Sequence, residues 1–280
     1  MTFHHRPMGL KVAAAVATFT AVAAGLIGCG GQSMPSSAMN ITGNWELEAT
    51  PAGSTTAANA VRVYLPVYLI ANSGNVSGMV LLPPTPDLIC AGNCCGGTLS
   101  AMNPSLTGTV DANGNLALGS ANPPGAAVFN MKGMVSGATL SNGSFTLTGM
   151  CGAQGTMAGI EYPPIDGTYT GAMASQNLGQ SFTVTLVLNQ SSGPNASGFL
   201  GLTGSLSPTG YSCLASTALQ VSTSFVGNSF GGQLNIATKE SFGYTGTLSA
   251  DGKTIAFTYG LVGGSGSCSG DYGKGTLTLQ

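Results

Sequence analysis

The sequence predicts an all-β protein made of two tandem antiparallel β-barrel or barrel-like units that are related by internal duplication. Three observations lead to this fold class. Apolar residues alternate with polar ones in several segments, which is typical of strands with one buried face. Turn-forming dipeptides separate these segments, and no segment after Cys29 has the sustained period of a helix. Short motifs also occur twice, in the same order along the chain.

The strands with the clearest pattern are segments 61–69 and 182–188, which carry an apolar residue at every second position. These apolar positions are Val61, Val63, Leu65, Val67 and Leu69 in the first segment, and Phe182, Val184, Leu186 and Leu188 in the second. Because successive side chains of a strand point to opposite faces, each set shares one face. Hairpin turns are predicted at Asn113-Gly114, Asn142-Gly143 and Asp251-Gly252.

The duplication is indicated by matches at a nearly constant spacing of about 120 residues. Ile41–Trp45 matches Ile165–Tyr169, and each match contains Gly-x-aromatic. Further matches in the same order are Cys95 with Cys213, Ser105–Gly108 with Ser224–Gly227, and Cys151 with Cys268. The repeat places one unit at 39–163 and the second at 164–280, each with room for a meander or a closed barrel.

Residues 1–28 have the layout of a secretory signal peptide, with a basic start followed by an uncharged apolar run. The run ends in Leu26-Ile27-Gly28-Cys29, which resembles the lipobox of bacterial lipoproteins. In that family the cysteine is diacylglycerated, the chain is cut before it, and the new amino terminus is usually acylated. The resemblance therefore implies that Cys29 carries lipid. The alternative is an uncleaved anchor helix, since the run is near the lower length limit for a membrane span.

The segment after the lipobox predicts how the protein is held. Residues 29–38 are mostly small and polar, so they are expected to form a flexible tether that carries the lipid at Cys29. Two or more acyl chains anchor a protein stably, so Cys29 would hold it on the membrane. By the same resemblance, Gly30 stands where inner-membrane lipoproteins carry Asp, which favours the outer membrane of a bacterial envelope. Which face of that membrane the protein occupies stays open.

Composition excludes several functions for the chain from Cys29 onward. Five cations stand against nine carboxylates, a formal net charge of −4, and they form no basic cluster, which argues against nucleic-acid binding. His4 and His5 both lie in the signal peptide. Without histidine, Ser-His-Asp and Cys-His catalysis and the commonest zinc sites are absent. The sequence therefore predicts no enzyme, no catalytic residue, no cofactor and no metal site.

Six cysteines remain once Cys29 is assigned to lipid. An exported chain meets an oxidising compartment, which favours three disulfides. The duplication pairs Cys95 with Cys151 and Cys213 with Cys268, and it leaves Cys90 to pair with Cys94. A metal cluster of Cys90, Cys94 and Cys95 is the alternative.

Gly43-Asn44-Trp45 and Gly167-Thr168-Tyr169 resemble the Gly-x-Trp motif in the first strand of lipocalin-like (calycin) barrels. The resemblance implies small barrels whose closed ends are plugged by Trp45 and Tyr169. Contact of these two rings with a ligand is the alternative role.

Together these features favour a membrane-anchored, non-catalytic binding module that encloses a small apolar ligand. The alternative is a structural or adhesive surface protein of the cell envelope, because the composition predicts neutral, polar outer faces. The two hypotheses differ in the barrel interior: a ligand needs a cavity of about 300 Å³ or more, whereas an adhesive barrel is filled by its own side chains. No protein partner is indicated.

Overall fold

The computed structural model describes residues 38–53, 62–80, 104–120, 128–148, 152–214, 218–237, 240–263 and 268–280. The regular elements in these ranges are sixteen β-strands, and they form two antiparallel sheets of eight strands each. The all-β tandem fold predicted from the sequence is therefore confirmed. No helix in the described ranges has the length and apolar character that a membrane crossing needs. The signal peptide and Cys29 lie outside the described residues.

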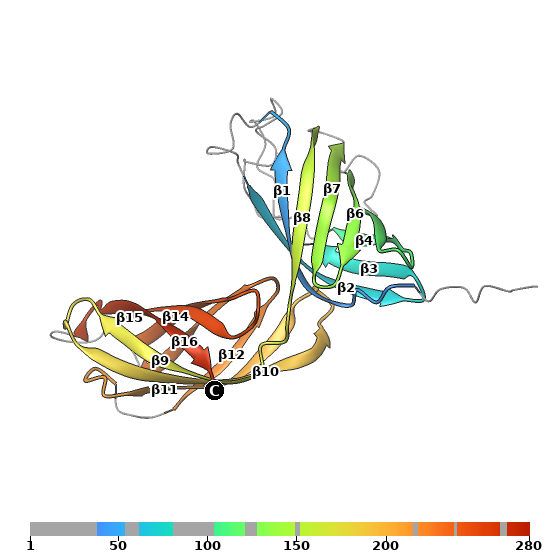
Figure 1. Cartoon of the computed structure of the whole chain (residues 1–280). Helices are drawn as coiled ribbons and strands as arrows, with labels where there is room; N and C mark the ends of the chain where they lie inside the picture. The colour runs from blue at the N-terminus through green and yellow to red at the C-terminus, as the bar shows by residue number, and fades with distance from the viewer. Residues whose placement is uncertain are drawn as a thin grey trace, which may run out of the picture. The chain divides into compact units, whose positions relative to one another are not determined.

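The first sheet is a closed barrel (Figure 1). Its strands are β1 (Gly43–Pro51), β2 (Val63–Asn72), β3 (Asn75–Val80), β4 (Ser105–Val110), β5 (Asn115–Ser120), β6 (Val128–Ser136), β7 (Thr139–Thr148) and β8 (Ala153–Tyr162). Each strand pairs with its neighbour in sequence, and β1 pairs with β8 to close the barrel. Closure leaves no strand of this sheet with a free edge.

The second sheet has the order β12-β11-β10-β9-β16-β15-β14-β13. Its strands are β9 (Gly167–Ser175), β10 (Ser181–Pro194), β11 (Leu200–Thr209), β12 (Leu219–Phe225), β13 (Ser229–Ala237), β14 (Glu240–Leu248), β15 (Thr254–Val262) and β16 (Tyr272–Leu279). The pairing of β9 with β16 is equivalent to that of β1 with β8. The hairpin of β12 and β13 is not paired along its length, so this sheet is a nearly closed barrel.

The predicted alternation of apolar and polar residues determines which side chains of β2 and β10 lie in the two cores. In β2 the side chains of Val63, Leu65, Val67 and Leu69 are buried, while the intervening Tyr64 is 50% exposed. In β10 the side chains of Phe182, Val184, Leu186 and Leu188 are buried in the same way. Apolar side chains thus point inward and polar ones outward, as period-two patterns require.

Two of the three predicted turns are confirmed. Asn113 and Gly114 lie between β4 and β5, and Asp251 and Gly252 lie between β14 and β15. In the second of these turns, the Gly252 amide donates a hydrogen bond of 2.9 Å to the Ser249 carbonyl oxygen.

The turn predicted at Asn142-Gly143 is wrong. Both residues lie within β7, where the pairing with β8 changes register between Leu140 and Gly143. Asn142 has a φ of +50°, a conformation that asparagine tolerates better than most residues. Gly143 lies so close to β8 that a Cβ would come within 2.3 Å of the Met157 carbonyl oxygen. The dipeptide therefore forms a β-bulge, and the chain reverses at Gly137 instead.

The structure supports the repeat only in part. Gly43 and Gly167 begin the equivalent strands β1 and β9, as the matched motifs predict. The match of Ser105 with Ser224 is wrong, because Ser105 begins β4 whereas Ser224 lies near the end of β12. Short Ser/Gly motifs recur by composition in this chain, so a match of this kind does not fix the register of the repeat.

Candidate binding groove

The described interior of both barrels is filled by side chains. The apolar residues of the two cores have exposures between 0 and 8%. A cavity wide enough for a ligand would also admit water, and its lining side chains would keep accessible surface. There is therefore no room for a ligand around these residues. A small apolar ligand enclosed elsewhere in the barrels stays a prediction.

The two plug candidates are both part of these cores. Trp45 is 1% exposed, and its indole N–H donates a hydrogen bond of 3.1 Å to the Ile41 carbonyl oxygen. Tyr169 is 0% exposed, and its hydroxyl donates to the Gly252 carbonyl oxygen at 3.0 Å. They belong to separate clusters of buried side chains, one for each sheet. Each ring is buried with its polar atom paired to a backbone carbonyl oxygen. The role of the two rings as plugs stays a prediction.

The first barrel has a groove on its outer face, across β4 to β7. Residues that pair directly across these four strands form one row: Thr109, Ala117, Lys132 and Ser144. A second row beside it contains Gly119, Asn130 and Thr146. These residues alternate with buried ones such as Leu116 and Leu118, so they face away from the core.

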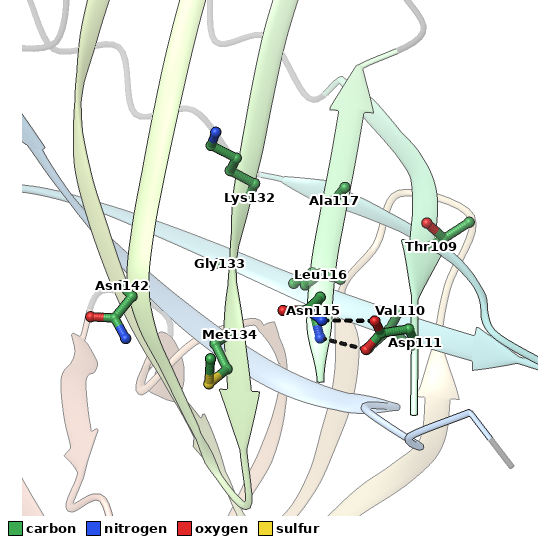
Figure 2. A pocket seen from close by; sticks show the side chains of 10 residues that line it. All are labelled: Thr109, Val110, Asp111, Asn115, Leu116, Ala117, Lys132, Gly133, Met134 and Asn142. Carbon is green, nitrogen blue, oxygen red and sulfur yellow. Dashed lines mark hydrogen bonds between the residues drawn. The ribbon is translucent and has the colours of Figure 1, made fainter. Parts of the chain in front are cut away.

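Two adjoining hollows of about 560 and 470 Å³ lie along these rows, and both include Ala117 and Lys132. Figure 2 shows the first hollow, with Asn142 and Lys132 on one side and Thr109 on the other. Ala117, Gly119 and Gly133 lower the floor because they have a small side chain or none. The volumes fall within the range of about 300–1,000 Å³ that is usual for small-molecule sites.

Lys132 and Asp111 are the two charged residues that line the groove, and they carry opposite charges. In the described part of the chain, the only ion pair joins Arg62 to Glu48 at 3.0 Å, so the Lys132 ammonium group has no carboxylate partner there. Amide groups of Asn130 and Asn142 lie on either side of it along the groove. An ammonium group offers three donors, and an amide offers both donors and an acceptor.

Asp111 also lines the groove, but its carboxylate is hydrogen-bonded within its own turn. Its carboxylate accepts hydrogen bonds from the Asn115 side chain at 2.7 Å and from the backbone amides of Asn113 and Asn115 at 2.8 and 2.9 Å. These bonds, that from the Asn115 side chain first, hold the pKa of Asp111 below its ordinary value. The carboxylate therefore stays ionised and fixes the edge of the groove.

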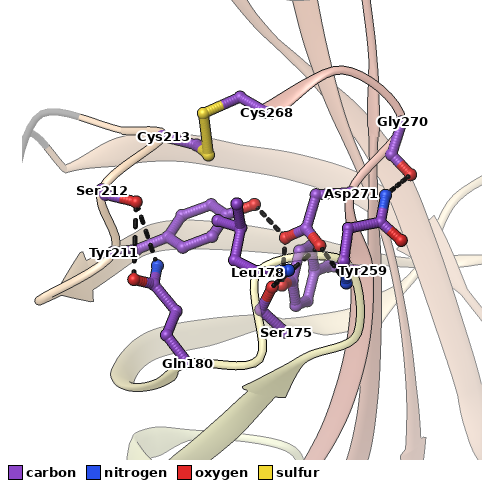
Figure 3. Close-up of a disulfide and its surroundings, with 11 residues drawn as sticks. Ser175, Leu178, Gln180, Tyr211, Ser212, Cys213, Tyr259, Cys268, Gly270 and Asp271 are labelled. Atoms are coloured by element: carbon purple, nitrogen blue, oxygen red, sulfur yellow. Dashed lines mark hydrogen bonds between the residues drawn. A yellow bond between two sulfur atoms is a disulfide. The ribbon is translucent and has the colours of Figure 1, made fainter. Parts of the chain in front are cut away.

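A second polar cluster is buried in the other barrel, next to the disulfide (Figure 3). Asp271 is 0% exposed. Its carboxylate accepts hydrogen bonds from the hydroxyls of Tyr211, Tyr259 and Ser175 at 2.5, 2.8 and 2.8 Å, and from the backbone N–H of Asn177 at 3.1 Å. Because every donor belongs to the protein and the group is buried, this cluster is suited to holding the loops at this end of the barrel together.

Burial alone would raise the pKa of Asp271, but the hydrogen bonds outweigh it. Those from Tyr211, Ser175 and Tyr259 favour the charged carboxylate and hold its pKa below the ordinary value. Burial, followed by the hydrogen bond to Asp271, raises the pKa of Tyr259 to about 12. The cluster is therefore one carboxylate held ionised by two neutral tyrosines.

A disulfide joins Cys213 to Cys268 with a Cα–Cα distance of 5.5 Å, as the duplication predicts. Cys213 lies close to Tyr211 in sequence and Cys268 lies close to Asp271. The disulfide therefore ties together the two loops that carry the hydrogen bond between Tyr211 and Asp271. The other predicted cysteine sites, Cys29, Cys90, Cys94, Cys95 and Cys151, lie outside the described residues.

Sequence reasoning missed both Lys132 and Asp271. The sequence signal for Lys132 was that it is the one cation among the alternate residues Asn130, Lys132 and Met134, which face outward. The signal for Asp271 was a carboxylate close to a bridged cysteine in a chain with few charges. Neither signal shows which neighbours the strand register brings together.

Fold and groove define a class: a tandem pair of eight-stranded antiparallel β-sheets with packed interiors and a polar groove on one outer face. The sequence matches no family model and no curated protein. Among solved structures it is similar to a protein of unknown function from the DUF3598 family of Nostoc punctiforme, at 10% identity and a TM-score of 0.23. The match covers 85% of this chain and 94% of that one. This TM-score is too low for the likeness to carry an argument.

Proposed function

We propose that this protein is a lipid-anchored binding module of the bacterial cell envelope, and that it binds a polar, negatively charged ligand in the groove around Lys132. Cys29 carries the lipid and the outer membrane is the favoured site. The protein is not an enzyme in this proposal, since its groove offers hydrogen bonds and a charge but no pairing of a nucleophile with a base.

The observation that carries the proposal is the contrast between the interior and the outer face. The core side chains are packed, whereas the groove is open, of ligand size, and lined by an unpaired ammonium group. A carboxylate, sulfate or phosphate group meets Lys132 as its natural counter-ion, and the flanking amides and hydroxyls add directional hydrogen bonds.

The test is native mass spectrometry of a Cys29→Ser chain that keeps its signal peptide and is purified from a bacterial envelope without denaturation. We expect a reproducible extra mass that is lost on denaturation and is absent from the Lys132→Glu variant. Lys274→Glu is the matched control, because Lys274 is also an exposed lysine within a strand, but in the second sheet. A mass lost equally in both variants would contradict the groove as the binding site.

The alternative function is a structural or adhesive surface protein, and the filled barrels favour it. In that case the purified chain shows its bare mass, both lysine variants behave like the parent, and binding takes place between surfaces. A bare mass with intact disulfides would therefore replace the binding proposal with the adhesive one.

Lipid attachment has its own test. When cells that express the full chain are fed a labelled fatty acid, we expect label on the protein and none on Cys29→Ala. Label that persists on Cys29→Ala would contradict the lipobox assignment.

A further inference from the structure

The second sheet is open at one place, the seam between β12 and β13. The two strands are joined by a tight turn, and a single β-bridge, Val226 with Ser229, pairs them. Beyond it, the Thr223 hydroxyl donates to the Gly231 carbonyl oxygen at 2.6 Å, and the rings of Phe225 and Phe230 meet edge to face. No ladder of backbone hydrogen bonds joins the two strands over the rest of their described length.

The equivalent hairpin of the first barrel shows that the fold does not require this gap. There β4 and β5 pair without interruption from Leu106 with Ser120 to Val110 with Leu116. In the second barrel, β12 pairs only with β11 and β13 only with β14, so each presents a row of backbone N–H and C=O groups at the seam. Such edges are templates for another strand.

Tyr244 supplies a second, independent observation. Its side chain is 3% exposed, and its hydroxyl is the one buried side-chain polar atom of the described residues without a hydrogen-bond partner. The end of the ring lies over Gly232 of β13, where a Cβ would meet the hydroxyl at 2.9 Å. An unpaired buried hydroxyl costs about 1–3 kcal/mol. Here it lies beside the open edge, where an incoming polar group can pair with it.

We propose that the seam binds an extended segment of another polypeptide, which adds as a ninth strand between β12 and β13. Its main chain pairs with both edges, and its entry breaks the Thr223–Gly231 hydrogen bond and the Val226–Ser229 bridge that join the two strands without it. On its inward face the guest strand has a small hydroxyl-bearing residue that pairs with the Tyr244 hydroxyl. Apolar residues on either side of it contact Val221 and Leu234. Its outward side chains are uncharged.

The surfaces beside the seam set this chemistry. Val221, Leu234, Phe225 and Phe230 are buried on the inner side, so alternate residues of the guest must be apolar. The exposed residues on the outer side of the two strands are neutral: Gln220, Ser222, Ser224, Gln233 and Asn235. A charged guest would find no counter-ion among them.

The experiment is hydrogen exchange of the Cys29→Ser chain, read by mass spectrometry. Without a guest, we expect amides of 219–225 and 229–237 to exchange at least tenfold faster than those of 105–110 and 115–120. The probe is a synthetic peptide with the sequence of Leu219–Phe225, whose one threonine has an apolar residue two positions away on either side and whose other residues are uncharged. Added in excess, it should slow exchange in both seam strands at least fivefold.

Two controls separate strand addition from unspecific binding. The same peptide with N-methyl groups at its two serines keeps its side chains but loses donors, and it should give no protection. Replacing the threonine of the peptide by valine should weaken binding by about tenfold to the parent chain, and by less than twofold to Tyr244→Phe.

Three results would overturn the proposal. The first is slow exchange of both seam strands without peptide, equal to that of β4 and β5. The second is exchange that the probe peptide leaves unchanged, or protection by the N-methylated peptide as strong as that by the probe. The third is protection that rises with protein concentration in the absence of peptide, which would assign the seam to a second copy of this chain.

Discussion

Asp271 is a buried carboxylate that forms no ion pair within the described ranges, and hydrogen bonds alone balance its charge. Tyr211, Tyr259, Ser175 and Asn177 supply them from three separate segments of the second sheet. A hydrogen bond to a charged group is stronger than a neutral one, at about 1.5–3 kcal/mol. At the scale of single residues, we therefore expect substitution of this carboxylate to destabilise the second barrel.

Asp271→Asn should destabilise the second barrel by about 3 kcal/mol, because an amide presents a donor to tyrosine hydroxyls that need an acceptor. Urea unfolding followed by tyrosine near-ultraviolet circular dichroism measures the loss. Asp251→Asn is the control, since that carboxylate lies in an exposed turn and should change the midpoint much less. Equal losses in the two variants would contradict the structural role given to Asp271.

The same cluster predicts how stability depends on pH. The folded pKa of Asp271 is lowered, so its contribution is complete above its unfolded pKa of about 3.9 and is lost as the pH falls through the folded value. The pKa of Tyr259 is raised to about 12, so its contribution is present below about pH 10 and is lost as the pH rises through the folded value.

We therefore expect the cluster to contribute constant stability between about pH 5 and 9, with losses on both sides. Urea midpoints of the second barrel across this range measure the effect. In Asp271→Asn the acid limb should flatten, because the titrating group is gone. An acid limb of unchanged slope in that variant would show that other carboxylates cause it.

At the scale of elements, the strands were predictable because the alternation of β2 and β10 is a local property of the sequence. The bulge in β7 was not predictable, because the dipeptide Asn-Gly is compatible with both a hairpin turn and a β-bulge. What decides between them is the approach of β8, whose Met157 carbonyl leaves no room for a Cβ at position 143. Such a contact depends on register, which the sequence does not display.

Gly143→Ala tests this reading of the bulge. The added Cβ would lie 2.3 Å from the Met157 carbonyl oxygen, so the β7–β8 ladder must shift, and we expect a loss of about 2–4 kcal/mol. Gly137→Ala is the control, because φ there is +56° but nothing lies within 4 Å of the new carbon. That variant should lose only about 1 kcal/mol from backbone strain. Thermal unfolding monitored by tryptophan fluorescence compares them.

At the scale of the whole molecule, the tandem architecture and the Cys213–Cys268 bridge followed from repeated motifs, which are visible without coordinates. The groove did not, because it depends on which outward residues of β4 to β7 stand in one row. Lys132 faces Ala117 on one side and Ser144 on the other only in the observed register. The filled interiors were also beyond the sequence, since alternation predicts inward side chains but not whether they meet.

Removing the disulfide should weaken one barrel and leave the other unchanged. It closes a loop across a separation of 55 residues, worth about 4 kcal/mol in the chain-entropy model. Trp45 is the only tryptophan and belongs to the first core, so its fluorescence follows the first barrel alone. In Cys213→Ala/Cys268→Ala, tyrosine dichroism should report a lower midpoint while the Trp45 transition stays in place. A Trp45 midpoint that falls in parallel would mean that both barrels unfold as one cooperative unit.

The closing pairs β1–β8 and β9–β16 also bear on how the chain acquires its structure as it is synthesised. Most strands pair with their immediate neighbours, so hairpins can form in order as the chain emerges. Gly43 to Pro51 must wait for the segment ending at Tyr162 before their second edge is covered. From that moment the first barrel holds every strand it needs. A chain halted there carries one finished domain ahead of one that has not begun to fold.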